Sequence, residues 1–251
     1  MVTQVKTPAE PQTEFPPKPD VSNLITEDDT PVDNFGSAKQ QRFLTNILYD
    51  SQKERIFLAD ANVGIYHHIK EPPIVPDFFL SLDVQVPTDF WAKNHRCYMV
   101  WEFGKVPEVA IEIVSNKVGG ELDEKLKIYQ RMRVLYYIVY DPQQHLGEKV
   151  LRIFKLTGLN YQETNETWLK EVALGLTFWE GEFEGISNTC LRWCDEAGDL
   201  LLTGEERAEN AEKRAENAEN NAIEANQRAE NAENELEKLK EKLRQQNINL
   251  D

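Results

Sequence analysis

The chain has 251 residues, of which 40% are hydrophobic and 10% aromatic, and it carries a formal net charge of −16 at pH 7. This length and composition allow one sizeable buried core with extensions. No stretch approaches the ~18 to 20 consecutive apolar residues of a membrane span, and residues 1–20 lack the apolar segment of a signal peptide. We therefore expect a cytosolic protein with one globular domain.

The negative charge speaks against nucleic-acid binding through a basic surface, because Lys and Arg side chains supply most of the affinity for phosphates. The charge is unevenly spread: residues 1–36 and 205–251 contribute −5 each, and the middle of the chain contributes −6. A site built from carboxylates is acidic until a metal ion reverses the local field. The composition therefore weakens a nucleic-acid-binding hypothesis without excluding it.

The N-terminal part of the chain changes character near Ser37. Residues 1–36 are rich in Pro, Asp, Glu and Thr, which predicts a flexible arm. Ser37 is expected to cap a helix that runs to about Asp50 and packs one apolar face on a sheet. Strands are expected at 56–67, 74–82, 96–103 and 109–115, the last two joined by a turn at 105–107.

The pattern then switches to that of a crossover. Gly120 precedes a predicted helix from about Glu121 to Met132, and the apolar run 135–140 ends at Asp141 and Pro142. Strand, helix and strand in this order imply a right-handed crossover and a partly parallel sheet. Further strands and hairpins are expected at 149–156, 168–174 and 189–202.

The final segment, 205–246, is an internal repeat with a period of seven residues. Its apolar residues alternate steps of three and four, which is the seam of a left-handed coiled coil. These residues are Ala208, Ala211, Ala215, Ala218, Ala222, Ala225, Ala229, Ala232, Leu236, Leu239 and Leu243. We expect a homo-oligomer that associates through 205–246, with a short tail at 247–251.

Two acidic residues in the predicted strands are candidate site residues. Asp77 follows Pro76 at the head of a strand, and Glu112 is the one acid in the otherwise apolar strand 109–115. An ionised carboxylate on a buried strand costs several kcal/mol unless it is paired or holds a metal. Glu112 is therefore either a metal ligand or a salt-bridged structural acid.

The helix after Gly120 supplies a third candidate. At about 100° per residue, Leu122, Leu126 and Tyr129 define its buried face, and Lys125 lies on the flank of that face. A lysine directed at the sheet can position a water and stabilise charge that develops on a phosphate. Alternatively, Lys125 pairs with Glu121 four residues earlier and has no chemical role.

These residues together resemble the Uma-two family of putative restriction endonucleases, which is abundant in cyanobacteria. The matching segments are Pro76-Asp77, Val109 to Ser115, Glu121 to Tyr129 and Tyr136 to Pro142, within residues 28–205. The resemblance implies an α/β fold in which a restriction-endonuclease-like mixed β-sheet is flanked by helices, here followed by a long C-terminal coiled-coil helix. The domain would span residues 37–204.

The resemblance also implies a PD-(D/E)XK type of site that hydrolyses DNA. Asp77, Glu112 and Lys125 would be catalytic, and Asp77, Glu112 and the backbone carbonyl of Ile113 would bind Mg²⁺, or Mn²⁺ in its place. Three positions depart from the pattern: Val114 replaces the usual lysine, Glu121 replaces aspartate, and no glutamate is evident at the start of the first helix.

The main alternative is a nuclease-like scaffold that binds protein or nucleic acid without cutting it. Val114 and the acidic charge favour that alternative, whereas Asp77, Glu112 and Lys125 together favour the enzyme. The three cysteines, with Cys190 and Cys194 as a lone pair, are expected to be reduced and are a poor zinc site. His67 and His68 are expected in a turn, and the five tryptophans in the core.

Overall fold

The computed structural model describes residue 20, residues 34–115 and residues 120–245. The predicted arm, 1–36, lies outside the described residues except for Asp20 and 34–36, and the predicted tail, 247–251, lies outside them entirely. The chain divides into two compact units, residues 1–201 and residues 202–251.

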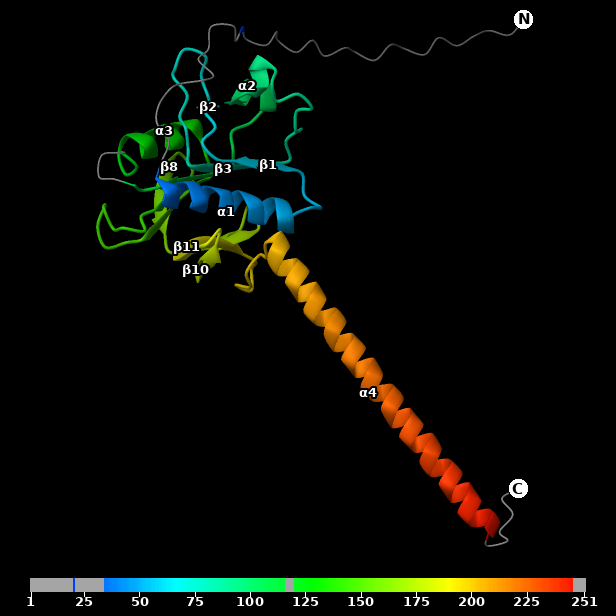
Figure 1. Ribbon diagram of the computed structural model, residues 1–251. Helices are drawn as coiled ribbons and strands as arrows, with labels where there is room; N and C mark the ends of the chain where they lie inside the picture. Colours follow the sequence, from blue (N-terminus) through cyan, green and yellow to red (C-terminus); the bar gives the residue numbers. More distant parts are fainter. Residues whose placement is uncertain (1–19, 21–33, 116–119, 246–251) are drawn as a thin grey trace, which may run out of the picture. The chain divides into compact units, whose positions relative to one another are not determined.

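The first unit is built on a six-stranded mixed sheet with the order β1-β3-β5-β6-β7-β8 (Figure 1). Only the central β5–β6 pair is parallel, as expected for strands joined through a helix, and the other neighbours are antiparallel. The strands are β1 (Phe57–Asp60), β3 (Phe78–Leu82), β5 (Val109–Ile113), β6 (Tyr136–Tyr140), β7 (Leu151–Thr157) and β8 (Asn160–Thr164). This arrangement confirms the predicted α/β class.

Both faces of the sheet are covered, because alternate side chains of each strand enter different cores. On one face, helix α1 (Phe35–Ser51) and a three-stranded sheet of β9 (Trp168–Leu169), β10 (Leu174–Phe183) and β11 (Ile186–Cys194) enclose the larger core. Figure 1 shows α1 between the main sheet and the β10–β11 hairpin. On the other face, helix α3 (Glu124–Met132) covers the smaller core.

A small parallel pair, β2 (Ile65–Tyr66) and β4 (Tyr98–Met99), completes this second face. It is accompanied by a short 3₁₀ helix, η1 (Lys93–His95), and by helix α2 (Val100–Phe103). The prediction of a strand over 96–103 is wrong in its second half. Gly104 adopts a left-handed φ of 77° and donates its amide to the Val100 carbonyl, which closes a single helical turn.

The predicted starts of the two longer helices also need correction. Asn34, not Ser37, is the N-cap of α1, because its side chain accepts the Ser37 amide at 3.0 Å. Helix α3 begins at Glu124 instead of Glu121, since Gly120 turns the chain at φ 70° and its carbonyl accepts the amides of Asp123 and Lys125. Of the predicted buried face, Tyr129 is fully buried, whereas Leu122 and Leu126 are only partly buried against the smaller core, and Met132 is buried as well.

After β6, β7 lies close to the predicted strand 149–156, but β8 was not foreseen. The predicted strand 168–174 is two strands: β9 ends at Leu169, the Val172 amide bonds the Leu169 carbonyl in the turn, and β10 starts at Leu174. Within the predicted hairpin segment 189–202, the chain turns at 195–198, where the Gly198 amide donates to the Asp195 carbonyl.

In its described part, residues 202–245, the second unit contains one helix, α4 (Gly204–Gln245), of 42 residues. Its seam side chains are largely exposed in the single chain, with Leu236 at 55% and Leu239 at 59%. Within the described ranges, every helix is too short or too polar to cross a membrane.

Candidate functional site

Asp77 and Glu112 lie side by side on neighbouring strands. The β3–β5 ladder pairs Phe78 with Ile111, and extending this antiparallel register by one residue sets Asp77 opposite Glu112. Directly opposed residues point to the same face, with Cβ atoms about 4.5–5.5 Å apart. The sheet therefore brings the two predicted acids together at one end of these strands.

Asp77 is held by the first helix and by the neighbouring strand. Its Oδ2 accepts the Ile113 amide at 2.6 Å, and its Oδ1 accepts the Gln41 side-chain amide at 2.8 Å. The side-chain Oε1 of Gln41 in turn accepts a hydrogen bond from the Asn62 side-chain amide at 2.8 Å. These bonds orient the Asp77 carboxylate across the end of β5.

Glu112 is 1% exposed and has two side-chain donors from α3. Its Oε2 accepts from the Lys125 Nζ at 2.8 Å, and its Oε1 accepts from the Tyr129 hydroxyl at 2.8 Å. Burial raises the pKa of Glu112 above its ordinary value, although Lys125 and Tyr129 act in the opposite direction. The ammonium group of Lys125 therefore favours the ionised form of Glu112.

Lys125 points at the sheet, as the helical spacing predicted. Its side chain is 30% exposed, and its Nζ also lies 3.8 Å from Oε1 of Glu121. Lys125 therefore points inward and also lies within ion-pair distance of Glu121, and its chemical role stays a prediction. Burial lowers the pKa of Lys125, but Glu112, Glu121 and Asp77 outweigh that effect and raise it.

Glu121 adds a third carboxylate near the ammonium group. The residue is 6% exposed, and its Oε2 is buried without a hydrogen-bond partner. Its backbone carbonyl accepts the Tyr137 hydroxyl at 2.8 Å, which fixes the turn before α3. Its negative charge is among the influences that raise the pKa of Glu112.

The donor set can be compared with the needs of a magnesium ion. Among the described residues, no three or more His, Cys, Asp and Glu side chains are grouped to hold a metal. Mg²⁺, however, commonly binds one or two carboxylates and retains several waters. The Ile113 amide faces Asp77, and in a strand the carbonyl of a residue lies on the same side as its amide. Two carboxylates and this carbonyl therefore fit Mg²⁺, and the Lys125 ammonium already places a cation against Glu112.

Two contributors to the site were missed by sequence reasoning. Gln41 lies 36 residues before Asp77 in the sequence. The available signal for a contact with the sheet was its place on the buried side of α1, one helical turn before Thr45. Tyr129 was expected only as a core residue. Its spacing of four from Lys125 places both side chains on one helix face, which was the available signal.

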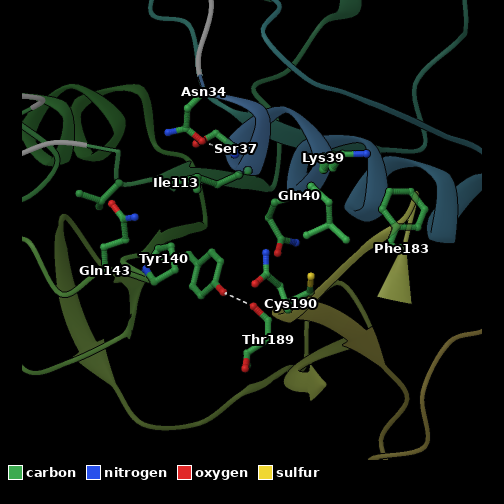
Figure 2. A pocket seen from close by; sticks show the side chains of 15 residues that line it. Asn34, Ser37, Lys39, Gln40, Ile113, Tyr140, Gln143, Phe183, Thr189 and Cys190 are labelled. Atoms are coloured by element: carbon green, nitrogen blue, oxygen red, sulfur yellow. Dashed lines mark hydrogen bonds between the residues drawn. The ribbon is translucent and has the colours of Figure 1, made fainter. Parts of the chain in front are cut away.

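A cavity of about 360 Å³ opens on the other side of the same strand end (Figure 2). Its walls come from the start of α1, the ends of β5 and β6, and the β10–β11 hairpin. Ile113 belongs to both places: its amide binds Asp77, and the residue lines the cavity.

Other predicted features have simpler outcomes. His67 and His68 lie in the turn that follows β2, as expected. Trp193 is fully buried, but Trp91 is 84% exposed, so the expectation of core packing is wrong for Trp91. It lies on a loop whose amides are held by Asp89, and the loop turns the indole outwards. The three cysteines are free thiols.

Comparison with known proteins shows a family to which the sequence is similar and solved structures with a similar fold. A family model described as Uma2, putative restriction endonuclease, matches residues 25–179. The chain is similar to a solved structure of a putative nuclease belonging to DUF820 from Anabaena variabilis, at 16% identity and a TM-score of 0.36. That match covers 53% of this chain and 68% of the other. A search of the curated proteins found no match.

Proposed function

The chain belongs to the Uma2 family of putative restriction endonucleases, and we propose that it is a Mg²⁺-dependent endonuclease that hydrolyses DNA phosphodiester bonds. The observation that carries the proposal is the placement of Asp77 opposite Glu112, with the Lys125 ammonium 2.8 Å from the Glu112 carboxylate. Two acids and one lysine at a strand end suit phosphodiester hydrolysis.

In this proposal, Asp77, Glu112 and the Ile113 carbonyl hold the metal ion. The bound ion would polarise the scissile phosphate and lower the pKa of a coordinated water. The Asp77 carboxylate is kept in place by the Ile113 amide and by Gln41, and Tyr129 fixes one oxygen of Glu112. A ligand that is already oriented loses less entropy when it binds.

Lys125 is proposed to orient the attacking water and to stabilise the negative charge on the phosphate. Val114 occupies the strand position where the resemblance expects lysine, and it is 1% exposed in the smaller core. Lys125 reaches Glu112 from α3 instead, so a cation is present beside the acid although it comes from another element. Preorganised charge of this kind is often the largest contribution to catalysis.

A second function is supported by one specific observation. Each carboxylate oxygen of Asp77 and Glu112 already accepts a hydrogen bond from a protein donor. A site satisfied in this way also suits a nuclease-like scaffold that binds a partner without cutting it. The two functions differ in whether the protein binds Mg²⁺ at these acids.

The test is nicking of supercoiled plasmid DNA by the full-length protein with Mg²⁺, with Mn²⁺ and with EDTA. We expect nicking with either metal and none with EDTA. The Glu112→Gln variant, which keeps the shape and loses the charge, should lose nicking by about 100-fold or more while it stays folded. Metal-dependent nicking that is equal in wild type and variant would assign the activity to a contaminant or another site.

A further inference from the structure

The cavity beside the candidate site is lined by two kinds of wall. It lies where the parallel strands β5 and β6 end, and Ile113 and Tyr140, which pair in the ladder, both line it. In Figure 2, Asn34 and Ser37 lie on one side of the group of side chains, and Tyr140 and Thr189 lie on the opposite side. At about 360 Å³, it is within the range of small-molecule pockets, about 300–1,000 Å³.

The wall formed by α1 suits an anion. This helix has 17 residues, and its positive N-terminal end opens at Gly36 and Ser37. Ser37 is only 4% exposed and lines the cavity, and its hydroxyl makes no hydrogen bond within the described part of the chain. Asn34 satisfies the amides of Ser37 and Ala38, which leaves the Gly36 amide for a ligand.

A cluster of charged side chains beside the cavity has the same preference. Lys39 and Arg42 both contact Glu184, at 3.0 Å and 2.6 Å, so the group keeps one net positive charge. The two cations hold the pKa of the Glu184 carboxyl down to about 2, so this carboxylate stays ionised and keeps both cations in place. Lys39 itself lines the cavity.

The opposite wall suits a flat ring with polar edges. Tyr140 provides aromatic surface on this wall, and Phe183 adds a second ring on the α1 side of the cavity (Figure 2), where it packs on Phe43 with ring centres 4.7 Å apart. Gln143 and Asn188 add side-chain amides, which can donate to and accept from the edge of a base. Stacking on aromatic rings combined with amide contacts is the usual way in which proteins hold an unpaired base.

We propose that this cavity binds one unstacked nucleotide of the substrate strand, with its phosphate at the start of α1 and its base against the aromatic and amide wall. The proposal rests on the proposed nuclease function, because the shared residue Ile113 links the cavity to the strand end that holds the acids. An inorganic anion alone would leave the aromatic wall unused. A purely apolar ligand would leave Ser37 and Gly36 without partners.

The test is an NMR titration of the metal-free full-length protein in EDTA with deoxynucleoside monophosphates, inorganic phosphate and deoxynucleosides in separate arms. The side-chain amide signals of Gln143 and Asn188 report on the cavity and not on the acids. We expect the monophosphates to shift these signals and to bind at least about tenfold more tightly than either fragment. No shift at millimolar ligand, or equal binding of inorganic phosphate, overturns the proposal.

Two neighbouring substitutions separate the cavity from the rest of the hairpin. Asn188→Phe fills the cavity. Ser187→Phe places the same ring on the preceding residue of β11, which is exposed and does not line the cavity. Followed through the Gln143 signal, nucleotide binding should fall by about tenfold or more in the first variant and stay unchanged in the second. Equal binding in both variants places the nucleotide elsewhere and refutes the assignment.

The titration and the nicking assay together distinguish this inference from the proposed function. DNA nicking by a wild-type protein whose cavity signals do not respond to nucleotides would leave the nuclease function standing and remove the cavity proposal. Nucleotide binding by a protein that never nicks DNA would keep the cavity as a nucleotide site and remove hydrolysis. The titration in EDTA needs no metal, so a failure of the metal site cannot produce a false negative for the cavity.

Discussion

The ion pair between Lys125 and Glu112 connects the stability of the protein to its proposed chemistry. Glu112 is almost fully buried, and an unpaired charge at such a place is strongly unfavourable. The lysine favours the ionised form of the acid, and an ionised acid is what a metal ion requires. The same contact therefore stabilises the metal-free fold and would prepare the proposed metal site.

The first residue-scale prediction concerns Lys125→Met. This change leaves Glu112 with the Tyr129 hydroxyl alone, and we expect the free energy of unfolding at neutral pH to fall by about 1.5–3 kcal/mol. Without the ammonium, burial raises the pKa of Glu112 further in the folded state. Urea unfolding at several pH values measures the loss.

The sign of the pH dependence follows from linkage. A folded-state pKa above the unfolded value gives stability that is present below the ordinary glutamate value of 4.5 and is lost as pH rises through the folded pKa. The gap between wild type and Lys125→Met should therefore be small in acid and widen towards neutral pH. Lys127→Met is the control, because Lys127 is 73% exposed and pairs with Asp123, which is also exposed. A gap that does not change with pH would contradict the coupling.

The second residue-scale prediction concerns Gln41→Glu. The substitution replaces a donor to Asp77 by a second carboxylate, so we expect a lower thermal midpoint without metal because like charges repel. With Mg²⁺, the added ligand should make the metal-induced rise of the midpoint larger than in wild type. Thermal scans with EDTA and with Mg²⁺ measure both effects. An identical metal-induced rise in the two proteins would show that Gln41 does not face the ion.

At this scale, the sequence predicts the acids better than their surroundings. Glu112 is conspicuous because an apolar strand carries one charge, and the inward direction of Lys125 follows from helical spacing. Gln41 could not be predicted, because its contact with Asp77 depends on how α1 crosses the end of the sheet. Tyr129 was placed in the core correctly, but a periodic pattern cannot reveal which acceptor its hydroxyl finds.

At the scale of elements, local turns account for the differences between expectation and structure. The run 96–103 has the composition of a strand, but β4 stops at Met99 and the chain closes a helical turn at Gly104. The β10–β11 hairpin turns at Glu184 and Gly185, both with positive φ, and only the glycine signals the turn in the sequence. The central crossover was predictable because its period changes from two to 3.6 residues.

The element-scale prediction tests how closely β10 approaches β11. A Cβ added to Gly175 would lie 2.6 Å from the Cys194 Sγ, so Gly175→Ala should lower the free energy of unfolding by about 1–3 kcal/mol. Cys194→Ala removes that sulfur, and the double variant should recover part of the loss. Urea unfolding of the three variants forms the cycle. Additive losses would show that the contact with the backbone, not the sulfur, is limiting.

At the scale of the whole molecule, we propose the division suggested by composition, with the boundary at 36/37 moved to Asn34 because α1 begins at Phe35: an arm, the nuclease-like domain to 204, a coiled coil at 205–246 and a tail at 247–251. The proposed chemistry belongs to the domain alone, whereas the repeat offers a means of association. Linking copies of a weak DNA-binding domain would raise its apparent affinity without any new contact. For a chain with a net charge of −16, that gain would matter.

The last prediction concerns this association. Helix α4 has 42 residues, and eight of its eleven seam positions are alanine, which buries little apolar area at ~25 cal/mol per Å². Alanine has the highest helix propensity, so the repeat should stay helical even when unpaired, while the leucines supply the contact. Leu236 and Leu239 are more than half exposed in one chain, and a second copy would cover them. Replacing Leu236, Leu239 and Leu243 by serine should reduce the mass measured by light scattering to that of the single chain. Serine at Ala218, Ala222 and Ala225 is the matched control and should leave the oligomer in place, whereas an unchanged oligomer in the leucine variant would show that residues outside the repeat hold the assembly together.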